Sequence, residues 1–115
     1  MTVYTIKEYP SYVRDRKRAI RQGLDVDELD SVLLMLSQGK TLPKKYKNHK
    51  LSGEWSGVWE CHIHDNFLLI YAKDKKKLIL WAIATGTHDE LFKHRWWGIP
   101  AIAASILLSL HHSVW

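Results

Sequence analysis

Four histidines of this chain stand among polar residues and are its first candidates for chemistry. Two of them lie one residue apart in the run HIHD, residues 62–65, and the others are His49 and His88. Histidine can act as a general acid or base near neutral pH because its unperturbed pKa is about 6.5. Cleavage of RNA needs a base for the 2′-hydroxyl, an acid for the leaving 5′-oxygen and cations beside the phosphate. Several histidines, a carboxylate and several lysines would supply these groups without a metal.

The same residues also allow a metal site. On a β-strand, His62 and His64 would point the same way, and both could bind one ion together with His49 or Asp65. A single HxH pair is a weak signal, however, and the chain has no HExxH motif and no cysteine cluster. Spacing alone leaves three alternatives open, namely a metal site, acid–base catalysis and a polar strand end without chemistry.

The residues around HIHD predict the strand that would position these side chains. The odd positions from Trp59 to Ile63 are apolar, and Glu60, His62 and His64 alternate with them. A period of two is typical of a strand with one buried face. We therefore expect Glu60, His62 and His64 to share one face of a sheet.

Three further segments have the composition of strands. Residues 3–9 carry β-branched and aromatic side chains ahead of Pro10, and residues 77–85 form an apolar run that Gly86 ends. Residues 67–72 are continuously apolar, as expected of a central strand that is covered on both faces. Because short turns link the last three strands, the sheet should be mainly antiparallel.

Two helices are predicted between the first strand and the others. Ser11 can cap a helix that runs to about Gln22. A second helix starts at Asp25, which has the spacing of a capping box with Glu28, and its apolar residues at i, i+3, i+4 and i+7 from Leu29 form one stripe. The predicted class is α+β, with a two-helix hairpin packed on one face of the sheet.

Length and composition indicate one small globular domain in a reducing compartment. The chain has 115 residues, of which 46% are hydrophobic and 25% charged. Cys61 is the only cysteine, which suits the cytoplasm because no intramolecular disulfide can form. Met1 is not followed by a basic stretch and a long apolar run, so we expect no signal peptide.

The net charge of +5 favours a polyanionic partner, most often nucleic acid. The positive charge is concentrated in an arginine-rich stretch, residues 14–21, and in a polar segment, residues 44–53, that we expect to be irregular. The lysines of the second cluster are Lys44, Lys45, Lys47 and Lys50.

The end of the chain differs from the rest in composition. Residues 96–115 contain no formally charged side chain, and Pro100 suits the first turn of a helix. A membrane anchor is one interpretation, but the apolar centre, residues 99–110, is short for a span. We favour a helical extension that packs on the domain or on a partner. The predicted division is a domain of residues 1–92 and an extension of residues 93–115.

Two longer stretches carry a family resemblance. The run LPKKYKNHKLSGEWSGVWECHIHDNFLLIY, residues 42–71, is followed by TGTHDELF, residues 85–92. In order and spacing these motifs resemble the RelE/ParE superfamily, and within it the YafQ-type toxins of bacterial type II toxin–antitoxin systems. The resemblance covers about residues 2–92 and implies a RelE-like fold.

The resemblance also implies an activity and partners. Such a toxin enters the A site of the ribosome, contacts ribosomal RNA and cuts the translated mRNA in the cytoplasm, with no metal or other cofactor. A cognate antitoxin, a small DNA-binding protein, would silence the toxin and carry it to operator DNA. The arginine-rich stretch would then either contact ribosomal RNA or be a solvated helix face.

Site residues follow from the resemblance position by position. His49 matches the loop histidine of the family's site, His62 the strand histidine and general-base candidate, and His88 the general-acid candidate. Phe92 matches the aromatic residue that positions a base by stacking, and Glu60 stands where the family has a carboxylate two residues before the strand histidine. His64 has no counterpart, and we expect it to be a bystander.

The chain departs from the family pattern at several positions, and Glu60 is one of them because it stands in place of the commoner aspartate. Asn66 replaces a second aspartate, for which Asp65 could substitute, and Ala84 stands where many members have an arginine. The loss of a cation facing the phosphate would weaken stabilisation of the transition state. Lysines of segment 44–53 could compensate, and these form the predicted substrate-binding set with Phe92.

Two rival functions remain open on the sequence. One is a catalytically weakened toxin that binds its antitoxin or the ribosome without cleavage, as the changes at Asn66 and Ala84 would allow. The other is a ParE-like inhibitor of topoisomerase, against which the set of polar histidines argues.

Overall fold

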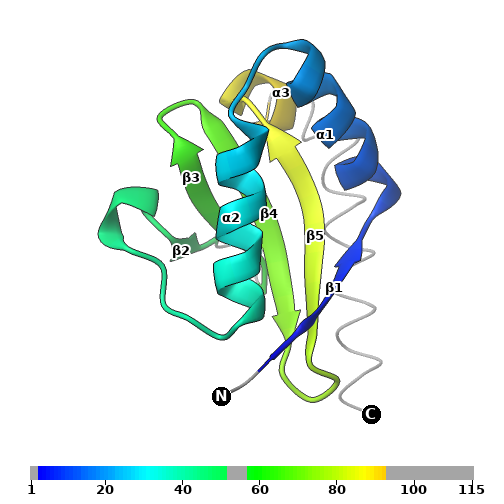
Figure 1. Cartoon of the computed structure of the whole chain (residues 1–115), viewed down its shortest axis with the longest axis vertical. Helices are drawn as coiled ribbons and strands as arrows, with labels where there is room; N and C mark the ends of the chain where they lie inside the picture. Colours follow the sequence, from blue (N-terminus) through cyan, green and yellow to red (C-terminus); the bar gives the residue numbers. More distant parts are fainter. Residues whose placement is uncertain (1–2, 52–56, 93–115) are drawn as a thin grey trace.

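The structure is a computed structural model that describes residues 3–51 and 57–92. Figure 1 shows a five-stranded sheet with the order β1-β5-β4-β3-β2, in which β1 is parallel to β5 and the other neighbours are antiparallel. The elements are β1 (Thr5–Glu8), α1 (Pro10–Arg21), α2 (Val26–Ser37), the 3₁₀ helix η1 (Lys44–Tyr46), β2 (His49–Lys50), β3 (Trp59–His64), β4 (Phe67–Asp74), β5 (Ile79–Gly86) and α3 (His88–Phe92). The predicted α+β class and mainly antiparallel sheet are confirmed.

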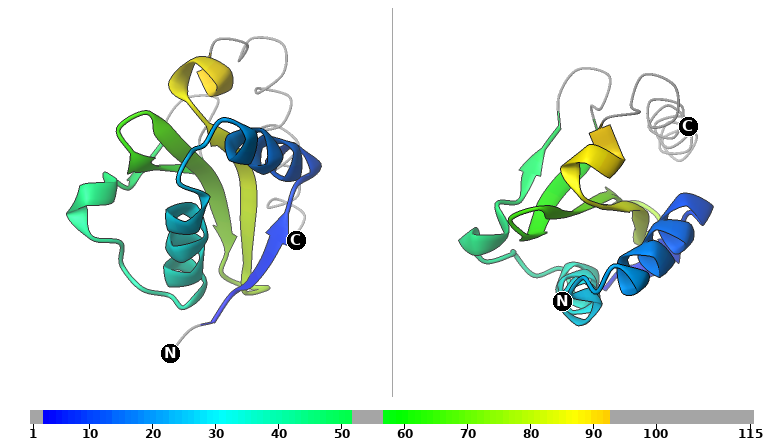
Figure 2. Two further views of the ribbon diagram at one scale, coloured as in Figure 1. Left: turned by 45° about the horizontal axis from the view of Figure 1, so that its top comes forward. Right: turned by 90° about the horizontal axis from the view of Figure 1, so that it is seen from above.

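Helices α1 and α2 lie together on one face of the sheet (Figure 2). The apolar stripe of α2 is buried there, since Leu29, Val32 and Leu36 are almost fully covered, and it joins a cluster that includes Cys61 and Ile63 of β3. The periodicity of 3.6 in α2 and the periodicity of two in β3 therefore predicted the correct buried faces.

A second apolar cluster lies on the opposite face of the sheet. Its members include Leu68 and Ile70 of β4, Ile83 and Ala84 of β5, and Leu91 of α3. Strand β4 thus contributes buried side chains to both faces, as its uninterrupted apolar run predicted. Of the candidate histidines, His49, His62 and His88 are found on the side of the sheet that carries this second cluster.

The start of α1 differs from the prediction. The helix begins at Pro10, whose fixed φ suits a first helical position, and its N-cap Tyr9 makes no side-chain cap. The Ser11 hydroxyl donates instead to the carbonyl oxygen of Ile83 at 2.6 Å. Ser11 therefore joins α1 to β5, and the prediction that it caps the helix was wrong.

The predicted capping box of α2 is only half formed. The Asp25 carboxylate accepts a hydrogen bond from the backbone N–H of Glu28 at 3.1 Å. The Glu28 carboxylate does not turn back toward Asp25 but accepts a hydrogen bond from the Tyr46 hydroxyl. This bond ties the loop that holds η1 to α2, and it raises the pKa of Tyr46 to about 12.

The segment expected to be irregular contains two short elements, η1 and β2. Strand β2 pairs with β3 through His49 opposite Glu60 and Lys50 opposite Trp59. Lys47 between η1 and β2 adopts a left-handed conformation with φ of 48°, which turns the chain from the helix into the strand. The single strand pair aligns His49 with the polar face of β3.

Residues 93–115, for which a helical extension was predicted, lie outside the described residues, as does the boundary drawn after Phe92. Within residues 3–51 and 57–92, the helices are too short or too polar to cross a bilayer.

A buried carboxylate fixes α1 on β5. Asp15 accepts a hydrogen bond from the backbone N–H of Thr85 at 3.2 Å, and the Arg18 guanidinium contacts its other oxygen at 3.2 Å. Burial raises the pKa of Asp15, while the Thr85 bond and the charge of Arg18 act in the opposite direction. The Thr85 hydroxyl in turn donates to the carbonyl oxygen of Leu68 at 2.6 Å. These bonds hold the end of β5 between α1 and β4.

We predict that Asp15→Ala destabilises the protein by about 1–3 kcal/mol, because the buried Thr85 N–H loses its acceptor. Urea denaturation would measure the loss. Lys17→Ala is the control, because Lys17 is exposed on the same helix and the substitution reports only the effect of an added alanine. Equal stabilities of the two variants would contradict this role of Asp15.

Candidate active site

Three histidines from separate parts of the chain lie side by side. His49 comes from β2, His62 from β3 and His88 from the first position of α3. The ring centroids of His49 and His62 are 6.2 Å apart, and those of His62 and His88 are 5.7 Å apart. Phe92 continues the row, with its ring centroid 5.8 Å from that of His88. The four predicted residues thus form one line of rings across the sheet edge.

Glu60 lies beneath two of these histidines and is only 5% exposed. One oxygen, Oε1, is 3.4 Å from Nε2 of His49 and 3.3 Å from Nε2 of His62. On the other side of the His49 ring, Nδ1 is 2.7 Å from the carbonyl oxygen of Lys47. Both ring nitrogens of His49 therefore face oxygen acceptors. Glu60 therefore orients two imidazoles at once.

His62 combines partial burial with an unused polar atom. Its side chain is 17% exposed, and Nδ1 is buried with no hydrogen-bond partner among the described residues. Cys61, the next residue back, points to the opposite face and takes no part, since burial raises the pKa of its thiol to about 12. The arrangement leaves imidazole as the proton-transfer group of this strand.

The motif Thr85-Gly86-Thr87-His88 positions His88 through a reciprocal cap. The Thr87 N–H donates to Glu90 Oε1 at 2.9 Å, and the Glu90 N–H donates to the Thr87 hydroxyl at 3.3 Å. The side chain of Asn66 accepts the backbone N–H of His88 at 3.1 Å. Asn66, a departure from the expected aspartate, therefore still binds the first turn of α3.

Helix α1 holds this cap from the other side. Glu90 Oε2 accepts a hydrogen bond from the Gln22 amide at 2.8 Å and lies 3.0 Å from Nε of Arg18. Although burial acts to raise the pKa of Glu90, its hydrogen bonds with Thr87 and Gln22 and the charge of Arg18 lower it overall. Sequence analysis missed this network, for which the spacing of Thr87 and Glu90 was the available signal.

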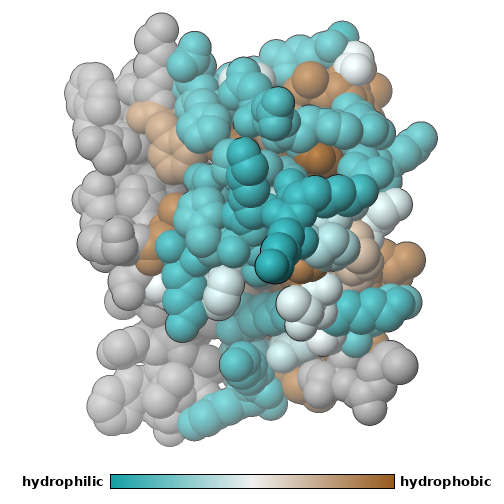
Figure 3. Space-filling view, turned by 90° about the vertical axis from the view of Figure 1, so that its left-hand side faces the viewer, coloured by the Kyte–Doolittle hydropathy of each residue, from teal (hydrophilic) through white to brown (hydrophobic). Residues whose placement is uncertain are grey.

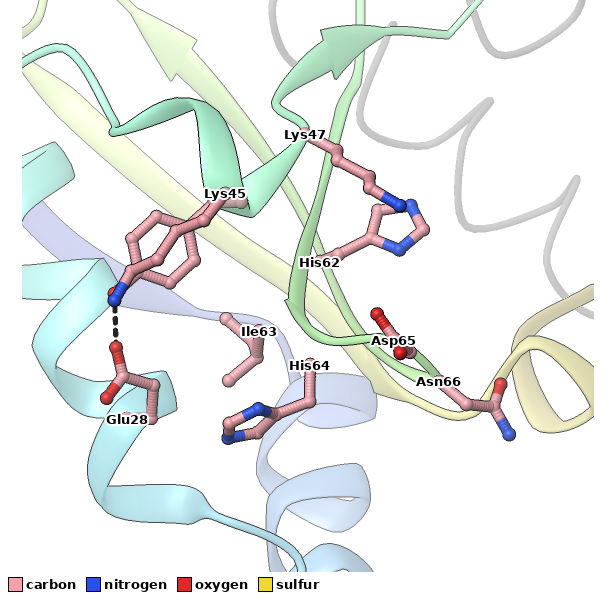
Figure 4. Close-up of a pocket in the computed structure, with 9 residues that line it drawn as sticks. Glu28, Lys45, Lys47, His62, Ile63, His64, Asp65 and Asn66 are labelled. Carbon is pink, nitrogen blue, oxygen red and sulfur yellow. Dashed lines mark hydrogen bonds between the residues drawn. The ribbon is translucent and has the colours of Figure 1, made fainter.

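A groove of about 500 Å³ opens beside His62, along the part of β3 that β2 does not cover. Figure 4 shows that Lys47 and His62 point to one side of β3, whereas His64 points to the other. Asp65 is exposed and lines the same groove. The described residues that line the groove are Glu28, Lys45, Tyr46, Lys47, His62, Ile63, His64, Asp65 and Asn66.

Comparison with known proteins identifies the family. Residues 4–93 match the family described as a bacterial toxin of type II toxin–antitoxin systems, YafQ. The chain belongs to the YafQ toxin family. It is 34% identical over 82 residues to the mRNA interferase toxin YafQ of Escherichia coli strain K12, a match that covers 70% of this chain and 87% of that protein.

Solved structures of YafQ and of a toxin from another bacterium have the same fold. The E. coli DinJ–YafQ toxin–antitoxin complex contains a chain with 31% identity and a TM-score of 0.71, and the match covers 77% of this chain and 97% of that one. A metal-bound toxin from Helicobacter pylori has 32% identity and a TM-score of 0.74, over 78% of this chain and all of that one. The predicted YafQ-type fold is thereby confirmed.

His64 does not share the face of His62, contrary to the prediction for this member of the YafQ family. The register of β3 against β4 shifts between these two residues, so the alternation of faces is broken at the strand end. His64 Nε2 lies 2.9 Å from a carboxylate oxygen of Asp25, at the N-cap of α2. This contact holds the His64 ring away from the row of imidazoles.

The four lysines predicted to bind substrate are divided by the fold. Lys47 lines the groove beside His62, and Lys45 lines it at a greater distance along η1, with its ammonium 5.0 Å above the Tyr46 ring. Lys50 points to the opposite face of β2, where its ammonium lies 5.5 Å above the Trp59 ring. Lys44 is exposed and is not part of the groove lining.

Ala84, at the position where the family resemblance predicts an arginine, is buried within the apolar cluster that also contains Ile70 and Leu91. Among residues 3–51 and 57–92, no group of three or more histidine, cysteine or acidic side chains is arranged to hold a metal ion. Lys47 lines the groove on the side of β3 to which His62 points (Figure 4).

Gly86 separates the buried end of β5 from the cap of α3. Its φ is +147°, and a Cβ atom there would lie 2.8 Å from Glu90 Oε1 and 3.2 Å from Nη2 of Arg18. Gly23, at the end of α1, also has a positive φ of +74°, but a Cβ atom there would meet nothing within 4 Å. Gly86 is thus crowded and Gly23 is not, but both have a backbone conformation that is unfavourable for other residues.

We predict that Gly23→Ala costs about 1–2 kcal/mol of stability, the cost of a left-handed backbone, and that Gly86→Ala costs more because its Cβ also displaces Glu90. Urea denaturation would give both values. The imidazole NMR shifts of His88 should change in Gly86→Ala and stay unchanged in Gly23→Ala. Identical stability losses and identical spectra would show that the crowding at Gly86 is not needed to place α3.

Proposed function

We propose that this protein is the toxin of a type II toxin–antitoxin system and cleaves translated mRNA on the ribosome as a metal-independent endoribonuclease. Membership of the YafQ family supports the toxin role, and the relative from E. coli K12 is named an mRNA interferase toxin. The observation that carries the proposed chemistry is the row of His49, His62 and His88 above the buried carboxylate of Glu60.

The proposed reaction is an in-line attack of the 2′-oxygen on the adjacent phosphorus. His62 accepts the proton of the 2′-hydroxyl as the bond from O2′ to phosphorus forms, and His88 donates a proton to the 5′-oxygen as its bond to phosphorus breaks. The products are a 2′,3′-cyclic phosphate and a 5′-hydroxyl. The separation of 5.7 Å between the two ring centroids suits a phosphate bound between the two imidazoles.

The neighbouring residues have supporting roles in this proposal. Glu60 positions His49 and His62, and the Lys47 ammonium stabilises negative charge on the phosphorane. Phe92 offers a ring face beside His88 on which a base can stack. Asn66 stands where the family has an aspartate. Asp65 is exposed in the same groove, three residues from His62, and we assign it the role of that aspartate.

The proposed partners are a cognate antitoxin, the mRNA and the ribosomal A site, all in the cytoplasm. A YafQ of E. coli forms a complex with DinJ, which is its antitoxin. The net charge of +5 and the exposed arginines of α1, Arg14 and Arg21, suit contact with ribosomal RNA. Operator DNA would be bound only through the antitoxin.

We predict that His62→Gln and His88→Gln each lower mRNA cleavage by roughly 10²–10⁴-fold, the usual contribution of a general acid or base. Primer extension on a reporter mRNA after induced expression would measure the cuts. Growth arrest should be relieved in parallel, and both variants should still form the antitoxin complex, because glutamine keeps a polar side chain of similar size at each position.

His64→Gln is the matched control, because His64 lines the same groove but contacts Asp25 and stands outside the row of imidazoles. It should cleave like the wild type. Full toxicity of a His62→Gln/His88→Gln double variant would overturn the assigned chemistry. If the wild-type protein binds ribosomes and antitoxin but does not cut the mRNA, the alternative of a catalytically weakened toxin is favoured. Ala84, which stands in place of an arginine, is consistent with that alternative.

We also predict that removal of bound transition metals leaves cleavage unchanged. The toxin would be treated with a chelator, desalted, checked for metal content by mass spectrometry and assayed on programmed ribosomes in magnesium buffer. Because the H. pylori relative was solved as a metal-bound toxin, restoration of lost activity by one added metal would count against the histidine mechanism.

A further inference from the structure

Strand β2 separates the candidate site from a second hollow. His49 faces Glu60 and the imidazole row, whereas its two neighbours, Asn48 and Lys50, line a pocket of about 460 Å³ on the helix side of the sheet. The side of the molecule that carries η1 and β2 is mostly hydrophilic (Figure 3). The His49 imidazole and this second pocket are thus on opposite sides of one edge strand that has only two residues.

The second pocket is strongly basic. Among the residues that the structure describes, its lining holds four lysines from separate segments and no carboxylate. These lining residues are Leu36, Gly39, Lys40, Thr41, Leu42, Asn48, Lys50, Gly57, Trp59, Tyr71, Lys73 and Lys75. Such a set of cations around a concave surface attracts an anion, and polar groups such as Asn48 and Thr41 can donate further hydrogen bonds to it.

Aromatic rings hold two of the lysines in place. The Lys50 ammonium lies 5.5 Å from the centroid of the Trp59 ring, and the Lys73 ammonium lies 5.0 Å from that of Tyr4. The Trp59 ring stacks in turn on Tyr71, whose hydroxyl donates to Asn48 at 2.6 Å. The cations therefore sit on a rigid floor, which lowers the entropic cost of binding a ligand.

The four lysines also repel one another in the absence of an anion. Burial lowers the pKa of Lys73, and the charge of Lys75 lowers it further. A bound phosphate would relieve this repulsion and would compensate for the lost hydration of Lys73. The pocket thus has an electrostatic reason to prefer an anionic ligand.

We propose that this pocket binds the phosphate backbone of a single-stranded RNA that crosses the β2 edge from the cleavage site. The inference rests on the proposed function, which puts an RNA strand against His49 on one side of β2. An RNA strand is favoured over an acidic peptide because the same polyanion already has to pass this edge, and its next phosphates reach Lys50 and the other lysines. The strand would be either the mRNA beyond the cut or ribosomal RNA.

The test compares two pairs of substitutions with the same change in charge. Lys40→Gln/Lys75→Gln removes two lysines of the pocket, and Lys76→Gln/Lys77→Gln removes two exposed lysines of the neighbouring turn that do not line it. The probe is a fluorescein-labelled, fully 2′-O-methylated single-stranded RNA, which cannot be cut because it lacks the attacking hydroxyl. Fluorescence anisotropy would give its affinity over a range of KCl concentrations.

For the pocket pair, we expect the slope of log K against log salt to flatten by about 1.4, since each lost contact with a phosphate of a single strand contributes about 0.7. The control pair should keep the wild-type slope. A dinucleotide, too short to span both sides of β2, should bind the wild type and the pocket pair equally. Binding of vacant ribosomes, measured by sedimentation, then distinguishes the two RNA sources. If the pocket binds ribosomal RNA, the pocket pair also loses ribosome binding, and if it binds the mRNA, ribosome binding is unchanged.

Equal slopes for both pairs would overturn the inference. If the pocket pair instead keeps the RNA slope but loses affinity for the antitoxin, the pocket serves a protein partner and the inference is also wrong. Because the probe cannot be cleaved, these outcomes are independent of the proposed chemistry. A wild-type protein without cleavage activity would overturn the proposed function and leave the binding result standing.

Discussion

The buried carboxylate of Asp15 is the constraint on which the candidate site depends most. It sits on α1 but binds the backbone of Thr85, one residue before the chain turns out of the sheet at Gly86. The guanidinium of Arg18 lies 3.2 Å from Asp15 and 3.0 Å from Glu90 of α3. One cation thus connects the body of the fold with the short helix that carries a catalytic candidate. A helix of five residues has little stability of its own, so its position must come from such contacts.

Most residues of the Thr-Gly-Thr-His motif also have a positioning role. Thr85 is buried and binds Asp15 and the backbone of Leu68, and Gly86 leaves room for Glu90. Thr87 closes the cap of α3. Three residues of the motif therefore serve to place the fourth, His88, which is the only one with a side chain suited to proton transfer. Most positions of this motif therefore serve to position a single imidazole.

Patterns with a regular period predicted the sheet and the helices well, because burial of one face imposes that period on the sequence. The apolar stripe of α2 and the alternation from Trp59 to Ile63 are examples. Local signals did worse where a distant group competed. Ser11 has a typical capping side chain, yet its hydroxyl donates to Ile83, 72 residues away in sequence. Glu28 likewise contacts Tyr46 and does not complete its capping box.

The site residues show the same limit. The family resemblance selected His49, His62, His88 and Phe92, which the fold does bring into one row, but spacing could not separate His62 from His64. That separation comes from a register shift against β4, and a shift of this kind leaves no trace in a short alternating pattern.

Strand β2 could not be predicted from periodicity, because two paired residues are too few to give a periodic signal. Yet this strand decides on which side of the sheet its basic residues lie. His49 and Lys50 are adjacent in sequence, but one contacts Glu60 and the other lies over Trp59, on opposite sides of the sheet. A cluster of lysines in the sequence is therefore not one patch in space. Because a strand of RNA can bend around an edge, this division would allow the proposed catalytic histidines and the proposed RNA-binding lysines to lie on opposite sides of a single strand.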